Sequence, residues 1–383
     1  MPKGNSRSTV FGQPSWQVAS STVEACVTET GGHLAPVTFD RRGRRIQPYH
    51  IAPWWNERVD QSVPTIVRVL RGDFFCMPFG GNAEAFRGEK HPVHGETANA
   101  KWKLESLDRD AGRTCLHLSL RTKVRKGRVD KSITLIDGHN AVYCRHAISG
   151  MSGPMNLGHH ANLRFPDEAG SGVLSTSPFV FGQVWVEPTE NPADRGYSIL
   201  KPGAVFRSLE RVPTITGETA DLTRYPARRG FEDIAHILAD ARRPYAWTAV
   251  TFPRERYVWF ALKDPKVLNG TLFWLSNGGR HYPPWNGRHV NVMGLEELTS
   301  YFHTGIAPSA RANSHTRRGI RTALQLDAAR PTVVNYIMAV ATIPAGFDRV
   351  KDIRLEETRA TLVAASGKRV AVPLDGGFLC SGH

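Results

Sequence analysis

Short runs of β-branched and aromatic residues recur along the chain, separated by turn residues about every 8 to 15 positions. Several runs alternate polar and apolar residues with the period of two expected when one face of a strand is buried. The clearest are 65–70, 115–120, 132–136, 248–252 and 257–262. Hairpin turns are indicated by Asp-Gly-His-Asn at 137–140, Asn-Gly at 269–270 and Asn-Gly-Gly at 277–279. This pattern predicts an all-β protein, a large antiparallel sandwich or barrel.

The strand pattern also sets the expected domain organisation. Residues 1–20 have the composition of a polar N-terminal arm, and 21–383 form one continuous pattern without a repeat or low-complexity linker. We therefore expect a single β-sandwich domain over 21–383. Convincing helical periodicity of any length is absent, and 294–302 could form a turn or two at most. The stretch 187–230 is irregular and rich in Pro, Gly and Arg, so we expect it to run over the surface near a site.

Composition excludes several classes of protein. With 40% hydrophobic and 22% charged residues, the 383-residue chain is too apolar to be disordered. No stretch approaches the roughly 20 apolar residues of a membrane-spanning helix, and the N-terminus has no secretory pattern. The five Cys form no CxxC pair, so neither a zinc ribbon nor a disulfide framework is expected. We expect a cytoplasmic protein without a membrane partner.

The net charge of +14 could indicate an anionic partner. The basic residues are nevertheless spread along the chain, and the densest groups, 41–45 and 121–131, lie beside Gly between strand-like runs. Solvated hairpins explain both groups. No zinc finger, helix-turn-helix or aromatic RNA-binding motif accompanies them, so no nucleic-acid partner is expected. A phosphorylated or acidic sugar remains a second explanation of the charge.

Four segments combine chemically active side chains with turn residues: 78–96, 156–166, 230–236 and 274–297. They allow two chemistries. His91, His94, His160 and Glu296 could be metal ligands, although their spacing is not specific. Alternatively, two His and two carboxylates could perform metal-free acid/base chemistry on a polyhydroxylated substrate that stacks on Trp or Tyr.

Position within a strand limits each candidate. His159 and His160 are adjacent, so on a strand they face opposite sides and only one can enter a given site. Glu296 follows the apolar run 292–295, and a partly buried carboxylate there needs either a partner or a raised pKa. The partner could be Arg280 or Arg288. A raised pKa would instead suit a general base.

Taken in order, these motifs resemble the galactose mutarotase-like (aldose 1-epimerase) superfamily over roughly 21–345. The resemblance begins with a Gly-Gly hairpin between Val23 and Pro36. It continues with His94-Gly95 followed by Trp102, with Gly158-His159-His160, with Asp233 before its strand, and with Leu295-Glu296. One departure is that the Asn-Arg pair usual ahead of the His-Gly is replaced by Gly81-Asn82-Ala83, with Arg87 or Arg71 as substitutes.

The resemblance implies a large β-supersandwich and an isomerase of carbohydrate metabolism that opens and recloses an aldose ring. Glu296 would be the base, His160 the acid, and His94 would polarise the ring oxygen; the neighbouring Glu297 leaves the identity of the base ambiguous. The implied substrate contacts are Asp233, Asn82, Arg87, Trp274, Trp285 and Arg280. The implied partner is a monosaccharide, modified or phosphorylated in one version, and neither a metal nor an organic cofactor is required.

Two alternatives accompany this hypothesis, because one fold can host several functions. The missing Asn-Arg pair favours a non-catalytic carbohydrate-binding or sensing protein. A polysaccharide lyase or glycosidase-related domain ranks third, because such enzymes are normally exported.

Overall fold

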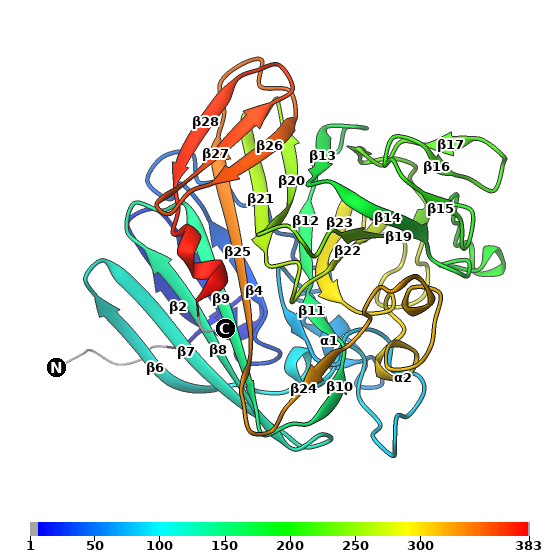
Figure 1. Ribbon diagram of the computed structural model, residues 1–383, viewed down its shortest axis with the longest axis horizontal. Coiled ribbons are helices and arrows are strands. Elements are labelled where there is room, and N and C mark those ends of the chain that lie inside the picture. The colour runs from blue at the N-terminus through cyan, green and yellow to red at the C-terminus, as the bar shows by residue number, and fades with distance from the viewer. Residues whose placement is uncertain (1–6, 382–383) are drawn as a thin grey trace. The chain divides into compact units, whose positions relative to one another are not determined.

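The computed structural model describes residues 7–381, and most of its regular structure is β-strand (Figure 1). Strands hold 47% of the residues and helices 6%, which confirms the predicted all-β class. The residues pack into two compact units. Within the described part, the first unit contains 7–160, 298–338 and 377–381, and the second contains 161–297 and 339–376. Because each unit is assembled from separated segments, no linker marks a boundary in the strand pattern over 21–383.

The first unit contains two larger sheets and several short elements. One sheet has the order β1-β2-β3-β4, with strands Ser8–Val10, Gln13–Ala19, Glu24–Thr28 and Leu34–Thr38. The other places side by side β9 (Ala141–Ser149), β8 (Gly127–Ile136), β7 (Arg113–Thr122) and β6 (Lys103–Asp110). The short strands are β5 (Phe75–Cys76), paired with β11 (Leu157–His159), and β10 (Gly153–Met155), paired with β24 (Leu324–Leu326). The helical turns are α1 (Thr65–Arg68), η1 (Glu96–Ala98), α2 (Ile306–Ser309) and η3 (Thr316–Arg318), and η4 (Gly376–Cys380) lies in this unit except for Gly376.

The beginning of the chain differs from the expected polar arm. Residues Ser15–Ala19 of β2 pair with β3, and Trp16 and Val18 are buried in the first unit. The strand was hard to recognise because Gly12 and Pro14 interrupt a short, polar sequence. The part of the arm over 1–6 lies outside the described residues. By contrast, β3 and β4 form the hairpin implied by the resemblance, with Gly31 and Gly32 both at positive φ.

The run 65–70 is not the strand that its β-branched residues predict. Thr65–Arg68 form the helical turn α1, which begins after Pro64. The Asn99 side chain accepts a hydrogen bond from the N–H of Ile66 at 2.8 Å, which supplies a partner to the start of this turn. Here a tertiary hydrogen bond outweighs the strand propensity of the residues.

The second unit is built from two sheets and two smaller strand groups. One sheet has the order β18-β13-β20-β21, with strands Arg224–Tyr225, Gly172–Thr176, Ala246–Phe252 and Tyr257–Lys263. The other has the order β15-β14-β19-β22-β23, with strands Val205–Phe206, Phe179–Val184, Phe231–Ala239, Gly270–Asn277 and Val292–Thr299, and β12 (Ala161–Arg164) also pairs with β23. The smaller groups are β16 (Val212–Pro213) with β17 (Thr219–Ala220), and β26 (Val350–Leu355), β27 (Arg359–Ala364) and β28 (Arg369–Pro373). Strands β25 (Thr332–Thr342) and β23 each contain residues of both units. The helical turn η2 (Pro192–Asp194) lies in the irregular stretch 187–230.

Some strands of this fold are buried on one face, and others are buried on both faces. Strand β8 alternates buried and half-buried positions, as a strand with one covered face should. Strands β20, β21, β22 and β23 are buried at every position. The expected helical turn over 294–302 is therefore wrong, because 292–299 continue a buried strand. A strand buried on both faces must give each of its polar side chains a partner.

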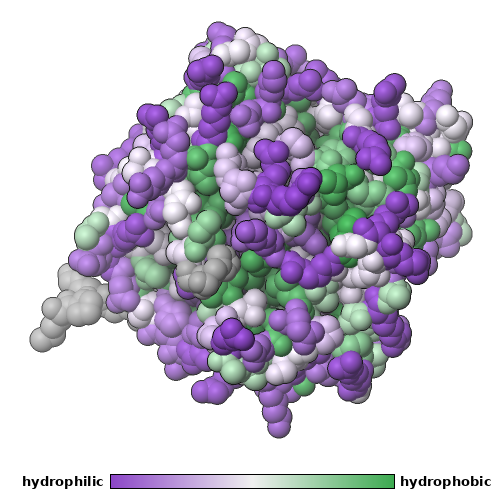
Figure 2. Space-filling model, in the orientation of Figure 1, coloured by the Kyte–Doolittle hydropathy of each residue, from purple (hydrophilic) through white to green (hydrophobic). Residues whose placement is uncertain are grey.

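The exposed face shown in Figure 2 has hydrophilic and hydrophobic residues interspersed. This agrees with basic residues that are spread along the sequence. No helix within residues 7–381 has the length and apolar character needed to cross a membrane.

Candidate functional site

His94 and His160 lie together in the first unit, against two phenylalanine rings. Their ring centroids are 5.2 Å apart and their planes are 73° apart. The His160 ring stacks on Phe74 at 4.6 Å, and the His94 ring meets the Phe79 ring edge-on at 5.0 Å. His160 is buried, whereas His94 is half-buried. Two imidazoles with apolar walls can exchange protons with a ligand and hold it away from water.

The neighbouring His159 has different surroundings, as the alternation of a strand requires. Its Nδ1 is 2.8 Å from the Asp73 carboxylate, and its ring lies 5.0 Å from His146 and 4.3 Å from Tyr336. His160 instead directs its ring to Phe74 and His94, and its backbone N–H donates to the Phe74 carbonyl at 2.9 Å. Of the two adjacent histidines, only His160 lies with His94.

The loop that carries His94 is folded tightly. His94 has φ +59°, and Gly95 follows with φ +75°. A Cβ at Gly95 would stand 1.9 Å from the Met77 carbonyl oxygen, so only glycine fits this close approach. The N–H of Gly80 donates to His94 Nδ1 at 3.4 Å, which places the proton of the neutral ring on Nε2. An Nε2–H can donate to a sugar oxygen.

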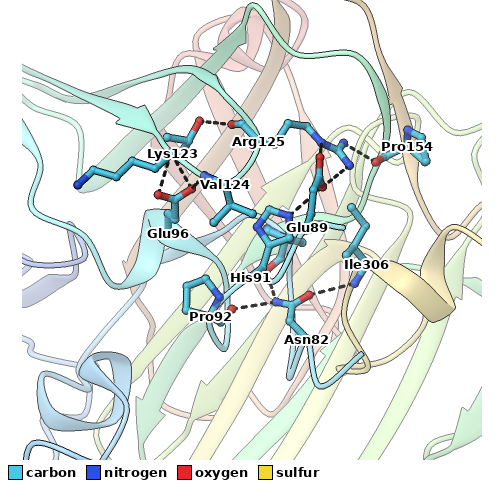
Figure 3. Close-up of polar contacts among 12 residues, drawn as sticks. Asn82, Glu89, His91, Pro92, Glu96, Lys123, Val124, Arg125, Pro154 and Ile306 are labelled. Carbon is cyan, nitrogen blue, oxygen red and sulfur yellow. Dashed lines mark hydrogen bonds and ion pairs between the residues drawn. The ribbon is translucent and has the colours of Figure 1, made fainter. Parts of the chain in front are cut away.

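Asn82 fixes this loop with both ends of its amide. Its Nδ2 donates to the carbonyls of Pro78, Gly80 and Pro92 at 3.0–3.2 Å. Its Oδ1 accepts from the N–H of Ile306, at the start of α2, at 3.0 Å (Figure 3). The side chain is buried and its polar atoms bond to backbone, so it positions the loop rather than presenting an amide to a ligand.

Two carboxylates anchor the same segment to the β7–β8 hairpin (Figure 3). Glu89 accepts two hydrogen bonds from Arg125, at 2.7 and 2.8 Å, and its Oε2 lies 3.0 Å from His91 Nε2. Glu96 accepts from the backbone N–H groups of Lys123 and Val124 at 2.9–3.0 Å. His94 therefore lies between two anchored positions, which restricts its movement.

Glu296 and Glu297 are adjacent on β23 in the second unit and have different roles. Glu297 accepts from Thr248 Oγ1 at 2.6 Å and from Thr271 Oγ1 at 2.7 Å, and it forms an ion pair with Lys263. Both members of this pair are buried. Glu297 is thus bonded within its own unit, and Glu296 stays the candidate base of the two.

Glu296 is buried, and burial raises its pKa well above the ordinary value, while the positive charge of Arg280 opposes the rise. Such a carboxyl gains a proton more readily than one in water. This is the property of a general base that must also return its proton.

Arg280 is held by two indole rings. Its guanidinium lies 4.9 Å from the Trp274 ring and 4.8 Å from the Trp285 ring, and Glu190 pairs with it at 2.6 Å. The His289 ring also stacks on Trp274, at 5.2 Å and 14°. Trp274 and Trp285 are about 95% buried, so little of either ring is left for a sugar. In this structure the two tryptophans position Arg280, which in turn acts electrostatically on Glu296.

Glu232 completes this network, and sequence reasoning missed it. Its carboxylate accepts from Trp274 Nε1 at 2.9 Å, from Ser276 Oγ at 3.0 Å and from the Gly279 N–H at 3.1 Å. Burial raises its pKa to about 7, while the nearby Arg280 charge acts in the opposite direction. The available signal was a second carboxylate beside Asp233, in a strand whose other residues are apolar except for His236.

Asp233 lies on β19, next to Glu232, and faces the irregular stretch. Its carboxylate accepts from the backbone N–H of Leu200 at 2.9 Å and of Ile199 at 3.1 Å. Burial raises its pKa to about 7, although both hydrogen bonds lower it. Asp233 thus ties down part of 187–230. Arg87, by contrast, is exposed in the first unit, with its guanidinium 5.1 Å from the Phe86 ring.

The alternative hypothesis, that His91, His94, His160 and Glu296 bind a metal ion, gains no support from where these side chains lie. Within residues 7–381, no group of three or more His, Cys, Asp or Glu side chains is placed so that it could hold a metal ion. His91, one of the set, bonds through Nε2 to Glu89.

The fold is that of the galactose mutarotase-like proteins, as the sequence motifs predicted. A galactose mutarotase-like protein from Clostridium acetobutylicum matches with a TM-score of 0.59 and 11% identity, over 88% of this chain and 98% of that one. A galactose mutarotase related enzyme from Lactobacillus acidophilus matches with a TM-score of 0.53 and 12% identity, over 86% and 99%. A candidate aldose 1-epimerase from Escherichia coli K12 matches with a TM-score of 0.56 and 13% identity, over 86% and 100%. No protein-family model matches the sequence, and no curated protein does.

Proposed function

We propose that this protein is an aldose 1-epimerase-like isomerase that interconverts the anomers of a sugar by metal-free acid/base ring opening. The observation that carries the proposal is that this fold holds two sets of side chains suited to acid/base chemistry, a carboxyl in the second unit and a pair of imidazoles in the first. A buried carboxyl with a raised pKa, Glu296, lies on a late strand, and the paired rings of His94 and His160 lie against Phe74. The similarity in fold to mutarotase-like proteins supports a sugar as the substrate.

In the proposed reaction, Glu296 removes the proton from the anomeric hydroxyl while His160 gives a proton to the ring oxygen. The C1–O5 bond breaks and an open-chain aldehyde forms. Rotation about the C1–C2 bond and closure with the two roles exchanged then deliver the other anomer. The His94 Nε2–H donates to the ring oxygen or a neighbouring hydroxyl. Arg280, held by Trp274 and Trp285, limits the rise of the Glu296 pKa so that the base ionises.

The test is anomer exchange measured by saturation-transfer NMR with neutral, acidic and phosphorylated aldoses. We expect catalysed exchange that falls by about 100-fold or more in Glu296→Gln and in His160→Asn, the usual contribution of a general acid or base. Glu357→Gln, at an exposed carboxylate, is the matched control and should retain the rate. Because the base must be ionised and its pKa is raised, the rate should increase with pH above the ordinary range of a glutamate.

A second candidate is a carbohydrate-binding protein without catalysis. It is favoured by the missing Asn-Arg pair ahead of His94-Gly95, where this chain has Gly81-Asn82-Ala83. Sugar binding without exchange on any sugar of the panel would select this candidate over the epimerase.

A further inference from the structure

The end of the β7–β8 hairpin forms a groove of about 510 Å³ in the first unit. Its lining contains four cationic side chains and no acidic one: Arg121, Thr122, Lys123, Lys126, Gly127, Arg128, Ser149 and Gly150. This is the first half of the basic stretch 121–131, which the sequence alone explains as a solvated hairpin. The groove is separate from His94 and His160, which are not among its lining residues.

Three of the four cations are not neutralised. Within residues 7–381, Arg121, Lys123 and Lys126 form no ion pair, whereas Arg128 pairs with Asp130 at 2.7 Å and with Glu105 at 3.4 Å. Arg121 and Arg128 stand directly opposite each other in the β7–β8 register. Like charges at opposed positions destabilise a sheet, and a bound anion would remove that repulsion.

The turn that presents these cations is held in place before any ligand binds. Thr122 Oγ1 donates to the Arg125 carbonyl at 2.6 Å, and Glu96 accepts from two backbone N–H groups of the turn. Arg125 itself turns inward to Glu89 and to the Pro154 carbonyl, at 2.7 Å (Figure 3). In the same view the Lys123 side chain extends away from Glu96. A site with a fixed backbone loses less entropy on binding than a mobile one.

The chemistry of the lining narrows the class of ligand. No aromatic residue lines the groove, so it lacks the stacking surface by which single-stranded nucleic acids are held. The exposed large hydrophobic residues, such as Phe11 and Tyr282, are not among its lining residues either, which disfavours insertion into a membrane. Its volume lies in the range of small-molecule sites.

We propose that this groove binds a linear phosphate chain, either as inorganic polyphosphate or as the triphosphate of a nucleotide. Lys123 and Lys126 contact the phosphates as point charges from the turn, and Arg121 contacts them from the end of β7 with its planar guanidinium. The proposal is independent of the epimerase activity, since it uses none of that site's residues.

The test is isothermal titration calorimetry of the full chain with tripolyphosphate, ATP and orthophosphate, at two salt concentrations. We expect tripolyphosphate to bind, orthophosphate to bind at least about tenfold more weakly, and added salt to weaken both. If ATP binds as tightly as tripolyphosphate, the groove recognises the phosphate chain both in a nucleotide and in inorganic polyphosphate. Weaker binding of ATP restricts the ligand to inorganic polyphosphate. The variant Lys123→Ala/Lys126→Ala should lose about tenfold or more in affinity, because charge-assisted hydrogen bonds are lost.

The matched control is Lys351→Ala/Lys368→Ala, which removes the same charge from exposed positions of the second unit. It should bind tripolyphosphate as the unchanged protein does. An equal loss in both double variants would overturn the proposal, because net charge alone would then explain the binding. No binding of tripolyphosphate, or equal affinity for orthophosphate, would overturn it as well. So would a DNA duplex that binds more tightly than tripolyphosphate and loses that affinity in Lys123→Ala/Lys126→Ala, which would assign the groove to nucleic acid.

Discussion

Replacing each of the adjacent residues Glu296 and Glu297 with Gln should have opposite consequences. Glu297 is the acceptor for Thr248 and Thr271 and the counter-charge of Lys263, all within a strand that is buried on both faces. Glu297→Gln leaves the Lys263 ammonium buried without a counter-charge, with neutral acceptors such as the Gly270 carbonyl and the Thr271 hydroxyl. Breaking a buried ion pair in this way costs about 3–5 kcal/mol.

The ionised carboxylate of Glu296 has the opposite effect on stability from that of Glu297. Burial is the main cause of its raised pKa, so ionising the side chain costs the folded protein stability, and this stability is lost as pH rises. Glu296→Gln removes that cost, and its free energy of unfolding should equal or exceed that of the unchanged protein. The same variant should abolish anomer exchange, whereas Glu297→Gln should lose stability first.

Urea unfolding at pH 8, followed by tryptophan fluorescence, measures both free energies. The double variant Lys263→Met/Glu297→Gln supplies the internal control, because it removes both charges at once. It should recover more than half of the loss seen in Glu297→Gln, as expected of coupled partners. The reasoning is refuted if Glu297→Gln unfolds at the same urea concentration as the unchanged protein, or if Glu296→Gln is the less stable of the two.

Three further predictions concern pH, a glycine and the hairpin anchor. The pKa of Asp233 rises from 3.8 to about 7 on folding, so its contribution to stability is complete below pH 4 and is lost as pH rises through 7, by about 4 kcal/mol. Urea midpoints at pH 5 and pH 8 should therefore differ less in Asp233→Asn, and a larger difference would contradict this. Gly95→Ala should unfold at a lower temperature than Gly88→Ala, because both have positive φ but a Cβ meets the Met77 carbonyl only at Gly95; equal melting temperatures would show that the contact is harmless. Arg125→Gln should destabilise by about 2 kcal/mol and speed hydrogen exchange over 89–96, whereas Arg121→Gln, without an ion pair in the described residues, should do neither; unchanged exchange in Arg125→Gln would show that the anchor does not restrict His94.

Local pattern predicted much of the fold. The alternating runs at 115–120 and 132–136 lie within β7 and β8, and those at 248–252 and 257–262 lie within β20 and β21. These runs succeeded because each belongs to a strand that pairs with one close in sequence, β7 with β8 and β20 with β21. The pattern failed at 65–70 and at 294–302, where the deciding partners lie in other elements: Asn99 caps the first as a helical turn, and β12 and β22 pair with the second as a strand.

The sequence by itself determined the all-β class, the order of the motifs and the residue types available for acid/base chemistry. It also implied that only one of two adjacent side chains on a strand can enter a given site, because successive side chains alternate between faces. Which residue of each pair is bonded to a distant partner was decided by the tertiary structure. Lys263 selects Glu297 as its partner from 34 residues away, and Asp73 selects His159 from 86 residues away. A carboxylate's role depends on the charges and burial around it, and strands distant in the chain supply both.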